Sequence, residues 1–146
     1  MKTSANGIAL IKDFEGFRSS PYLCSGGVAT IGYGATFYAD GRRVTLQDDP
    51  ITEPQADKLL RDTLVHFENI VKKRLTVSVN QNQFDALVSH TFNTGGSATL
   101  FRLVNQRDFA KAASWMETTY TTAKGKVLQG LVRRRKKETE LFLTAI

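Results

Sequence analysis

The sequence predicts an α+β protein that is mainly helical, with one small antiparallel sheet near its N-terminus. Two patterns carry this prediction. Residues 28–38 alternate between larger apolar and small or polar side chains and are followed by Asp40-Gly41, which is typical of a β-hairpin. From Thr52 onward the apolar residues instead recur at the spacing of a helix face.

Length and composition indicate one compact domain. The chain has 146 residues, of which 41% are hydrophobic and 23% charged, enough to bury a core of its own. No apolar run approaches the roughly 20 residues that span a bilayer, and the first residues do not resemble a signal peptide. We therefore expect no stable membrane insertion. Cys24 is the single cysteine, so no intrachain disulfide is possible, and we expect neither a metal nor a cofactor.

The first expected element is a helix that follows Ser4 and ends at Gly16. Ile8, Ile11 and Glu15 are spaced i, i+3 and i+7, so the glutamate lies on the apolar face. A carboxyl group in such a place is suited to donating a proton near neutral pH, because burial disfavours its charged form. The alternative is a glutamate at a helix end with its carboxylate in water.

The strand after this helix has one nearly bare face. Thr30, Gly32, Gly34 and Thr36 fall on that face, and the predicted partner is a return strand at 42–46. Because glycine has no side chain, a ligand or another backbone can approach closely. The pattern is consistent with a groove for an extended polar ligand, and equally with a tightly packed strand.

Five helices are expected in the remainder of the chain. The first begins at a capping box formed by Thr52 and Gln55 and is long enough to connect two lobes. The expected division is a single domain of 1–146 with the following parts: a β lobe at about 16–51, a connecting helix at about 52–74, and a helical lobe at about 1–15 and 75–146. The later helices are expected at 81–92, 97–104, after Asp108, and 131–143.

The net charge of +6 is unevenly distributed. Residues 1–51 hold five Lys or Arg and five Asp or Glu, whereas residues 52–146 hold fifteen and nine. A basic half favours a polyanion such as nucleic acid, an acidic membrane surface or an anionic cell wall, although it also serves solubility. The aromatic residues lie mostly on inward helix faces rather than among basic residues, which argues against nucleic acid.

Several motifs, in order along nearly the whole chain, resemble those of phage-type lysozymes, glycoside hydrolase family twenty-four. That family reads Glu-Gly, then Tyr-x-Asp, then Gly-x-x-Thr-Ile-Gly-x-Gly. The matching residues here are Glu15-Gly16, Tyr22, Cys24 and Thr30 to Gly34. Further matches to the family's central helix, cleft-edge turn and last helix are residues 80–87, 92–95 and 130–143.

The resemblance implies a two-lobed lysozyme-like fold, in which a small β lobe and a helical lobe flank a cleft. It also implies a muramidase that cuts the β-1,4 bond between N-acetylmuramic acid and N-acetylglucosamine in peptidoglycan. Glu15 would be the general acid and Thr30 would help to position the attacking water. Substrate-binding residues would be Gly34, Thr36, Phe92 and Asn93, and Arg134 would form an ion pair with Glu15.

By the same resemblance the protein would be a phage endolysin that acts in host lysis. We expect a monomer that stays in the host cytoplasm until a holin opens the inner membrane, and that then acts on the periplasmic cell wall. Bacterial peptidoglycan would be its partner, and nucleic acid would not.

Cys24 departs from the family pattern, which usually has Asp at this position. Three catalytic roles are open: a group that positions water, a thiolate base, or a nucleophile that forms a thioglycoside. Of these, the first two, with inversion at the anomeric carbon, are preferred over the nucleophile. Cys24 can also be a small buried hydrophobe. A separate alternative for the whole protein is a peptidoglycan-binding module whose catalysis is weakened because Cys24 replaces the Asp.

The basic run Arg133 to Lys137 is expected to form a solvated helix face. Ion pairs at i, i+4 spacing are predicted between Arg134 and Glu138 and between Lys136 and Glu140. His66 and His90 fall in expected helices, and both are interpreted as structural.

Overall fold

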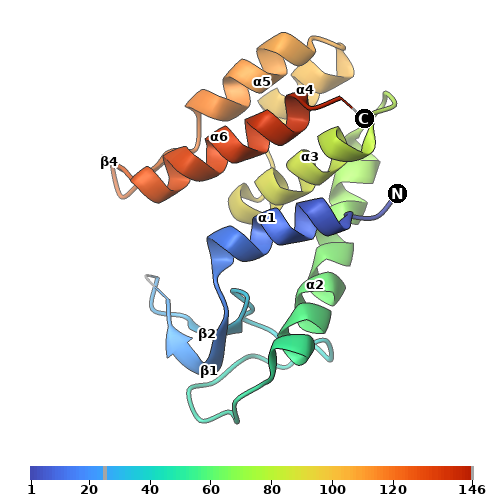
Figure 1. The fold of residues 1–146 in the computed structure, drawn as a ribbon. Helices are drawn as coiled ribbons and strands as arrows, with labels where there is room; N and C mark the ends of the chain where they lie inside the picture. Colours follow the sequence, from blue (N-terminus) through green and yellow to red (C-terminus); the bar gives the residue numbers. More distant parts are fainter. Residues whose placement is uncertain (25, 146) are drawn as a thin grey trace. The chain divides into compact units, whose positions relative to one another are not determined.

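The computed structural model describes residues 1–24 and 26–145. Figure 1 shows the helices and strands, and the prediction of a mainly helical α+β protein with small antiparallel sheets is confirmed. The elements are α1 (Ala5–Glu15), β1 (Arg18–Leu23), β2 (Ala29–Gly32), α2 (Glu53–Arg74), α3 (Gln81–Thr94), α4 (Ala98–Asn105), α5 (Phe109–Thr118), β3 (Thr122–Ala123), β4 (Lys126–Val127) and α6 (Gln129–Leu143).

The chain forms two compact units. The β unit comprises residues 11–66, and the helical unit comprises residues 1–10 together with 67–146. Helices α1 and α2 each contribute residues to both units, because the divisions fall within them.

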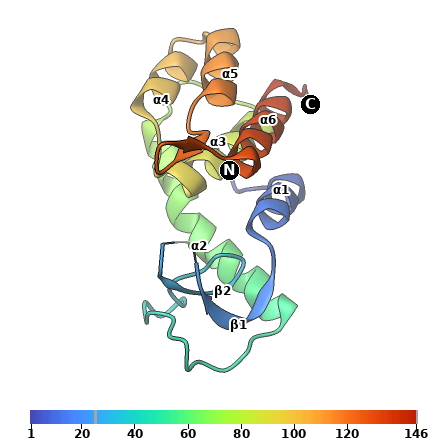
Figure 2. The ribbon, with the colours of Figure 1, turned by 90° about the vertical axis from the view of Figure 1, so that its left-hand side faces the viewer.

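The sheet of the β unit pairs different segments from those predicted. β1 runs antiparallel to β2, with Tyr22 opposite Thr30, and Figure 2 shows the two strands side by side. The predicted return strand at 42–46 is wrong, since this segment makes only an isolated bridge between Phe37 and Arg43. The sequence did not reveal β1, because it contains Pro21 and leaves most of its residues exposed.

Two glycines explain why β2 is shorter than the alternating pattern. Gly32 and Gly34 have φ values of 66° and 76°, which end the extended conformation where the sequence still alternates. Gly32 also packs against α2, because a Cβ at this position would lie 3.1 Å from the Ala56 Cβ. Of the two interpretations left open for Gly32, the structure supports the close packing of a strand on a helix.

The core of the β unit joins β2 to α2. Ile31, Val44 and Leu59 form a buried cluster, with Ile51 and Tyr38 packed against it. The predicted capping box starts α2, because the Thr52 N–H donates to Gln55 Oε1 at 2.8 Å and the Gln55 N–H donates to Thr52 Oγ1 at 3.3 Å.

The helical unit is built around α3. Helix α6 packs against α3 and α5, and α5 also packs against α4 (Figure 1). Asn80 caps α3 through a capping box with Gln83, and Gly95 ends the helix in a left-handed conformation, with φ 85°. The buried apolar side chains include Phe84, Leu87, Val88, Leu100, Phe101, Val104, Ala112, Met116 and Phe142.

The basic run on α6 is only partly solvated. Arg133, Lys136 and Lys137 are exposed, but Arg134 and Arg135 are 3% and 0% exposed, so the prediction of a solvated face is wrong for these two. The predicted pair of Arg134 with Glu138 is confirmed at 3.3 Å.

Glu140, in contrast, has a different partner from the one predicted. Its carboxylate lies 3.6 Å from Lys137 Nζ, whereas Lys136 was expected to form this pair.

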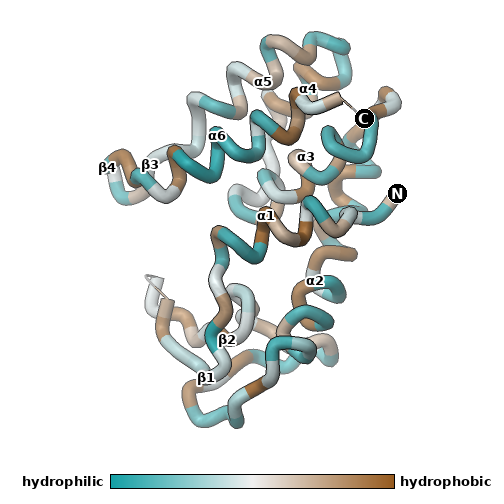
Figure 3. Tube along the Cα trace, in the orientation of Figure 1, coloured by the Kyte–Doolittle hydropathy of each residue, from teal (hydrophilic) through white to brown (hydrophobic). Residues whose placement is uncertain are grey.

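Hydrophobic and hydrophilic residues alternate along the helices of both units (Figure 3). Among the described residues, no helix combines the length and the apolar character needed to cross a membrane.

Candidate active site

The last turn of α1 is fixed within the β unit by an ion pair to α2. Lys12 Nζ lies 2.6 Å from Asp57 Oδ1 and 3.5 Å from Glu53 Oε1. The hydrogen bond to Asp57 raises the pKa of Lys12, and the same bond, together with one from Arg61, lowers the pKa of Asp57. Both groups therefore stay charged over a wide pH range, which anchors the helix turn that carries Glu15.

Glu15 is the last residue of α1, and its side chain is half-buried. Gly16 follows with φ 69° and ends the helix. The Glu15 carboxylate lies against Gly34, because a Cβ built on Gly34 would be 2.5 Å from Glu15 Oε1. Gly34 therefore provides the space in which the Glu15 carboxylate lies, a role the sequence did not indicate.

Replacing Gly34 with Ala is expected to reduce activity by about 10²-fold, since displacing a reacting group by about 1 Å can cost that much. The new methyl group would meet Glu15 Oε1 at 2.5 Å and push the carboxylate aside. Gly41→Ala is the matched control. Gly41 also has positive φ, 87°, but no atom lies within 4 Å of a Cβ there.

Both variants should lose a similar amount of stability, about 1 kcal/mol, because both force alanine into a left-handed conformation. Initial rates on purified peptidoglycan and the free energy of unfolding would be measured for each. Equal activity of the two variants would contradict the assigned role of Gly34.

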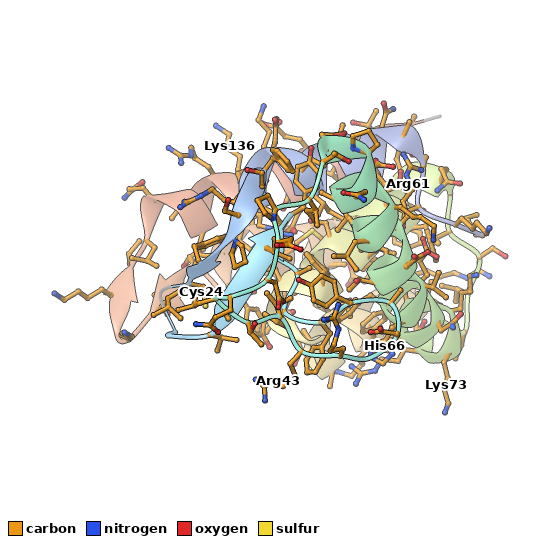
Figure 4. The ribbon with its side chains drawn as sticks, turned by 90° about the horizontal axis from the view of Figure 1, so that it is seen from below. Cys24, Arg43, Arg61, His66, Lys73 and Lys136 are labelled. Atoms are coloured by element: carbon orange, nitrogen blue, oxygen red, sulfur yellow. The ribbon has the colours of Figure 1, made fainter. Side chains whose placement is uncertain are left out.

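Cys24 lies directly after β1, where the hairpin turn begins (Figure 4). Its N–H donates to the Val28 carbonyl at 3.0 Å, and its carbonyl accepts from the Gly27 N–H at 2.8 Å. The backbone N–H groups of Val28 and Gly26, with a smaller contribution from the Thr30 hydroxyl, lower the pKa of the Cys24 thiol below its ordinary value. Such a group of convergent N–H donors favours an anion.

Thr30 lies on β2 and is 3% exposed. Its hydroxyl donates to the Val28 carbonyl at 2.9 Å and also contributes to the lowered pKa of Cys24. A hydroxyl has one proton and two lone pairs, so while it donates to the carbonyl it can still accept from a water molecule. The structure thus brings Cys24 and Thr30 together on one hairpin.

Tyr22 lies within electrostatic reach of two predicted catalytic residues. Burial raises the pKa of Tyr22, Arg18 opposes this rise, and negative charge on Glu15 and on Cys24 adds to it. The Arg18 guanidinium lies 4.4 Å from the centre of the Tyr22 ring. Tyr22 was part of the sequence motif but had no assigned role.

The remaining predicted binding residue of the β unit is Thr36. It is half-buried in the segment that follows Gly34, and its carbonyl accepts a hydrogen bond from the Val44 N–H at 3.0 Å.

The helical unit contains the other predicted site residues. Phe92 and Asn93 lie in the last turn of α3, and Phe92 is half-buried with its ring 5.2 Å from that of Phe67. Arg134 lies on α6, and its Nη2 contacts the backbone carbonyl of Ser89 at 3.3 Å. The predicted ion pair of Arg134 with Glu15 stays a prediction.

The two histidines occupy different environments. His66 is exposed on α2 in the β unit (Figure 4). His90 is buried on α3, where burial and then the nearby positive charges of Arg135 and Arg134 lower its pKa to about 3. His90 is therefore neutral at physiological pH, which suits a side chain within a helix bundle.

Over the described residues, no group of three or more His, Cys, Asp or Glu side chains is placed to hold a metal ion.

A mainly helical fold with a small β-hairpin, and a carboxyl group at the end of the first helix, are features of the lysozyme class of glycoside hydrolases.

The comparisons with known proteins agree with this class. The family model described as phage lysozyme matches residues 12–138. The endolysin of Bacillus phage B103 is 42% identical over 150 residues, which are 99% of this chain and 55% of that protein. This chain therefore spans about half the length of that relative.

Two solved structures are similar over their full length. The endolysin from Escherichia coli O157:H7 phage FAHEc1 has a TM-score of 0.90 and 34% identity, covering 100% of this chain and 96% of that one. The muramidase domain of SpmX from Asticaccaulis excentricus has a TM-score of 0.86 and 39% identity, covering 99% of both. The chain belongs to the phage lysozyme family and has the fold of that family, as the sequence predicted.

Proposed function

We propose that this domain hydrolyses the β-1,4 bond between N-acetylmuramic acid and N-acetylglucosamine in bacterial peptidoglycan, as a phage endolysin does in host lysis. The observation that carries the proposal is the placement of Glu15 against Gly34 in the unit that also contains the Cys24–Thr30 hairpin. The similarity to endolysins and to a muramidase domain supports the choice of substrate.

In the proposed reaction, Glu15 donates its proton to the glycosidic oxygen as the bond to the anomeric carbon breaks. Positive charge then develops on the sugar ring as an oxocarbenium-like transition state. Because Lys12 and Asp57 fix the last turn of α1 and Gly34 leaves room beside it, the carboxyl group has a defined position before substrate binds.

Cys24 takes the place that a carboxylate usually holds in this family. Hydrogen bonds from the backbone N–H groups of Val28 and Gly26 favour the thiolate, which accepts a proton from water and carries negative charge. We infer that the Cys24 thiolate and the Thr30 hydroxyl orient a water molecule that attacks the anomeric carbon, with inversion of configuration.

The fragments that the enzyme releases from purified peptidoglycan test the proposed function directly. A muramidase should release fragments that end in reducing N-acetylmuramic acid, detected by mass spectrometry after borohydride reduction. Fragments that end in reducing N-acetylglucosamine, or an absence of soluble fragments, would contradict the proposal.

Substitution of Cys24 tests its role. Cys24→Asp should be active because a carboxylate accepts the same hydrogen bonds and is charged at neutral pH. Cys24→Ala should be about 10²-fold slower, because general base catalysis typically contributes 10²–10⁴-fold. Cys24→Ser should be intermediate at best, since its hydroxyl does not ionise.

The pH profile provides a second measurement. The base acts when deprotonated and Glu15 acts when protonated, so wild-type activity should have a bell-shaped pH dependence, with one limb set by Cys24, whose pKa lies below the ordinary thiol value. In Cys24→Asp this limb should move to lower pH, toward the pKa of a carboxyl group, about 4. Full activity of Cys24→Ala, or a covalent sugar adduct on the thiol, would contradict the role as a base.

The basic character of residues 52–146 suits a polymer with anionic peptides, so the net charge of +6 is expected to assist binding to peptidoglycan. We further propose that the protein acts as a monomer. It would be held in the host cytoplasm until a holin opens the inner membrane, and would then reach the periplasmic cell wall.

A further inference from the structure

Asn93 has a fixed amide orientation because of a buried arginine. Arg135 Nη2 donates to Asn93 Oδ1 at 2.8 Å, and Arg135 is 0% exposed whereas Asn93 is exposed at the end of α3. The guanidinium group of arginine has only hydrogen-bond donors. The amide of Asn93 must therefore turn its oxygen toward Arg135 and its NH₂ group away from it.

Arg135 in turn has little freedom to move. Its Nε lies 2.8 Å from Glu138 Oε1, its Nη2 donates to Glu138 Oε2 at 3.3 Å, and Ser89 Oγ donates to the same Oε2. These groups belong to α3 and α6, which pack against each other. A buried chain of hydrogen bonds thus runs from Ser89 through Glu138 and Arg135 to the exposed amide.

Two consequences follow for the amide of Asn93. A charge-assisted bond to its oxygen polarises the amide and strengthens its N–H groups as donors. An amide that is free to rotate can serve as donor or acceptor, but this one can only donate at its exposed side. A neutral acceptor with a fixed dipole, such as an amide carbonyl, matches such a donor better than a hydroxyl group, which can reorient its own proton.

We propose that Arg135 is a positioning residue that makes Asn93 a dedicated hydrogen-bond donor to the acetamido carbonyl oxygen of a bound N-acetylhexosamine. This inference rests on the proposed function, which supplies a glycan with an acetamido group on each sugar. It assigns a role to Arg135, which the sequence had placed on a solvated face, and it states which atom of Asn93 contacts the substrate.

The variant Asn93→Asp removes the N–H groups of the amide and keeps an oxygen, so it tests the donor role alone. An aspartate keeps an oxygen for Arg135 but has no N–H to offer. The fold and melting temperature of this variant should be retained. Its KM on soluble glycan strands should rise about 3- to 10-fold, as expected for one lost hydrogen bond, and its kcat should stay within about 2-fold. Asn82→Asp is the matched control, since it places the same charge on α3, near the opposite end.

The added negative charge could by itself repel an anionic glycan, so binding would also be measured with a neutral oligomer of N-acetylglucosamine. The loss should persist with this ligand for Asn93→Asp and be absent for Asn82→Asp. A loss that is confined to anionic strands, or one that is equal in both variants, would overturn the proposal.

NMR spectroscopy can observe the side-chain amide of Asn93 directly. In ¹⁵N-labelled wild-type protein, the side-chain NH₂ signals of Asn93 should shift when the N-acetylglucosamine oligomer is added, and those of Asn82 should not. In Arg135→Lys the shift should be reduced, because lysine lacks the planar fork. If that variant fails to fold, the wild-type titration and Asn93→Asp still test whether Asn93 is the donor. An undiminished shift in the folded variant would overturn the positioning role of Arg135.

Unshifted Asn93 signals at saturating ligand would overturn the proposal. A wild-type protein that neither binds the oligomer nor cleaves peptidoglycan would instead reject the underlying function.

Discussion

Glu15→Gln is expected to lower the rate of peptidoglycan hydrolysis by about 10²–10⁴-fold, the range that a general acid typically contributes. The substitution is nearly isosteric but removes the proton that would be transferred to the leaving oxygen. Gly34 leaves the space that this side chain occupies, and a glutamine amide has almost the same size as the carboxyl group. The fold should therefore be preserved.

The measurement compares initial rates and melting temperatures of Glu15→Gln and Asp13→Asn. Asp13 is exposed on the same helix two residues earlier, so Asp13→Asn makes the same kind of change at a position with no assigned role. Near-wild-type rates for Glu15→Gln would remove Glu15 from the mechanism, whatever the product analysis shows. Binding of glycan should change little in either variant.

The helices and their starts could be predicted because their signals are local. The capping box at Thr52 and the cap at Asp108 are each visible within four residues of sequence, and both are present in the structure. The partner of β2 could not be predicted in the same way. Strand pairing depends on tertiary contacts, and β1 has neither the alternation nor the composition of a typical strand.

The candidate site, like the fold, could be predicted from the sequence only in part. A motif could point to Glu15, Cys24 and Thr30, but not to the convergent N–H groups around the Cys24 sulfur, because these depend on the conformation of the hairpin turn. Nor could it show that Gly34 makes room for Glu15, since glycine is equally compatible with a turn, a groove or close packing.

The buried charges on α6 have a recognisable pattern in the sequence. Leu131, Arg135, Glu138 and Phe142 are spaced by four, three and four residues, which is the stripe of a buried helix face with two charged members. Arg135 and Glu138 are both 0% exposed. Opposite charges within an otherwise apolar stripe can therefore indicate a buried pair rather than a solvated face.

This buried pair leads to the second large effect that we expect. Glu138→Gln should lower the free energy of unfolding by about 3–5 kcal/mol, because breaking a buried ion pair leaves a charge without compensation. Glu138 is the carboxylate partner of both Arg134 and Arg135, at 3.3 Å and 2.8 Å. Burial lowers the pKa of Arg135, an effect that the negative charge of Glu138 opposes, so the guanidinium depends on this partner.

Glu140→Gln is the matched control, because it makes the same chemical change two residues away on the same helix. Glu140 faces solvent, and its pair with Lys137, at 3.6 Å, is typical of surface ion pairs that contribute about 0–1 kcal/mol. Urea unfolding of the two variants at neutral pH would give both values. Similar losses would show that the buried charges are not coupled as the distances indicate, whereas a loss confined to Glu138→Gln would show that the arginines depend on this carboxylate. The double variant Arg135→Met/Glu138→Leu should recover part of that loss, because it replaces the pair with apolar side chains of similar volume and leaves no charge unpaired at position 135.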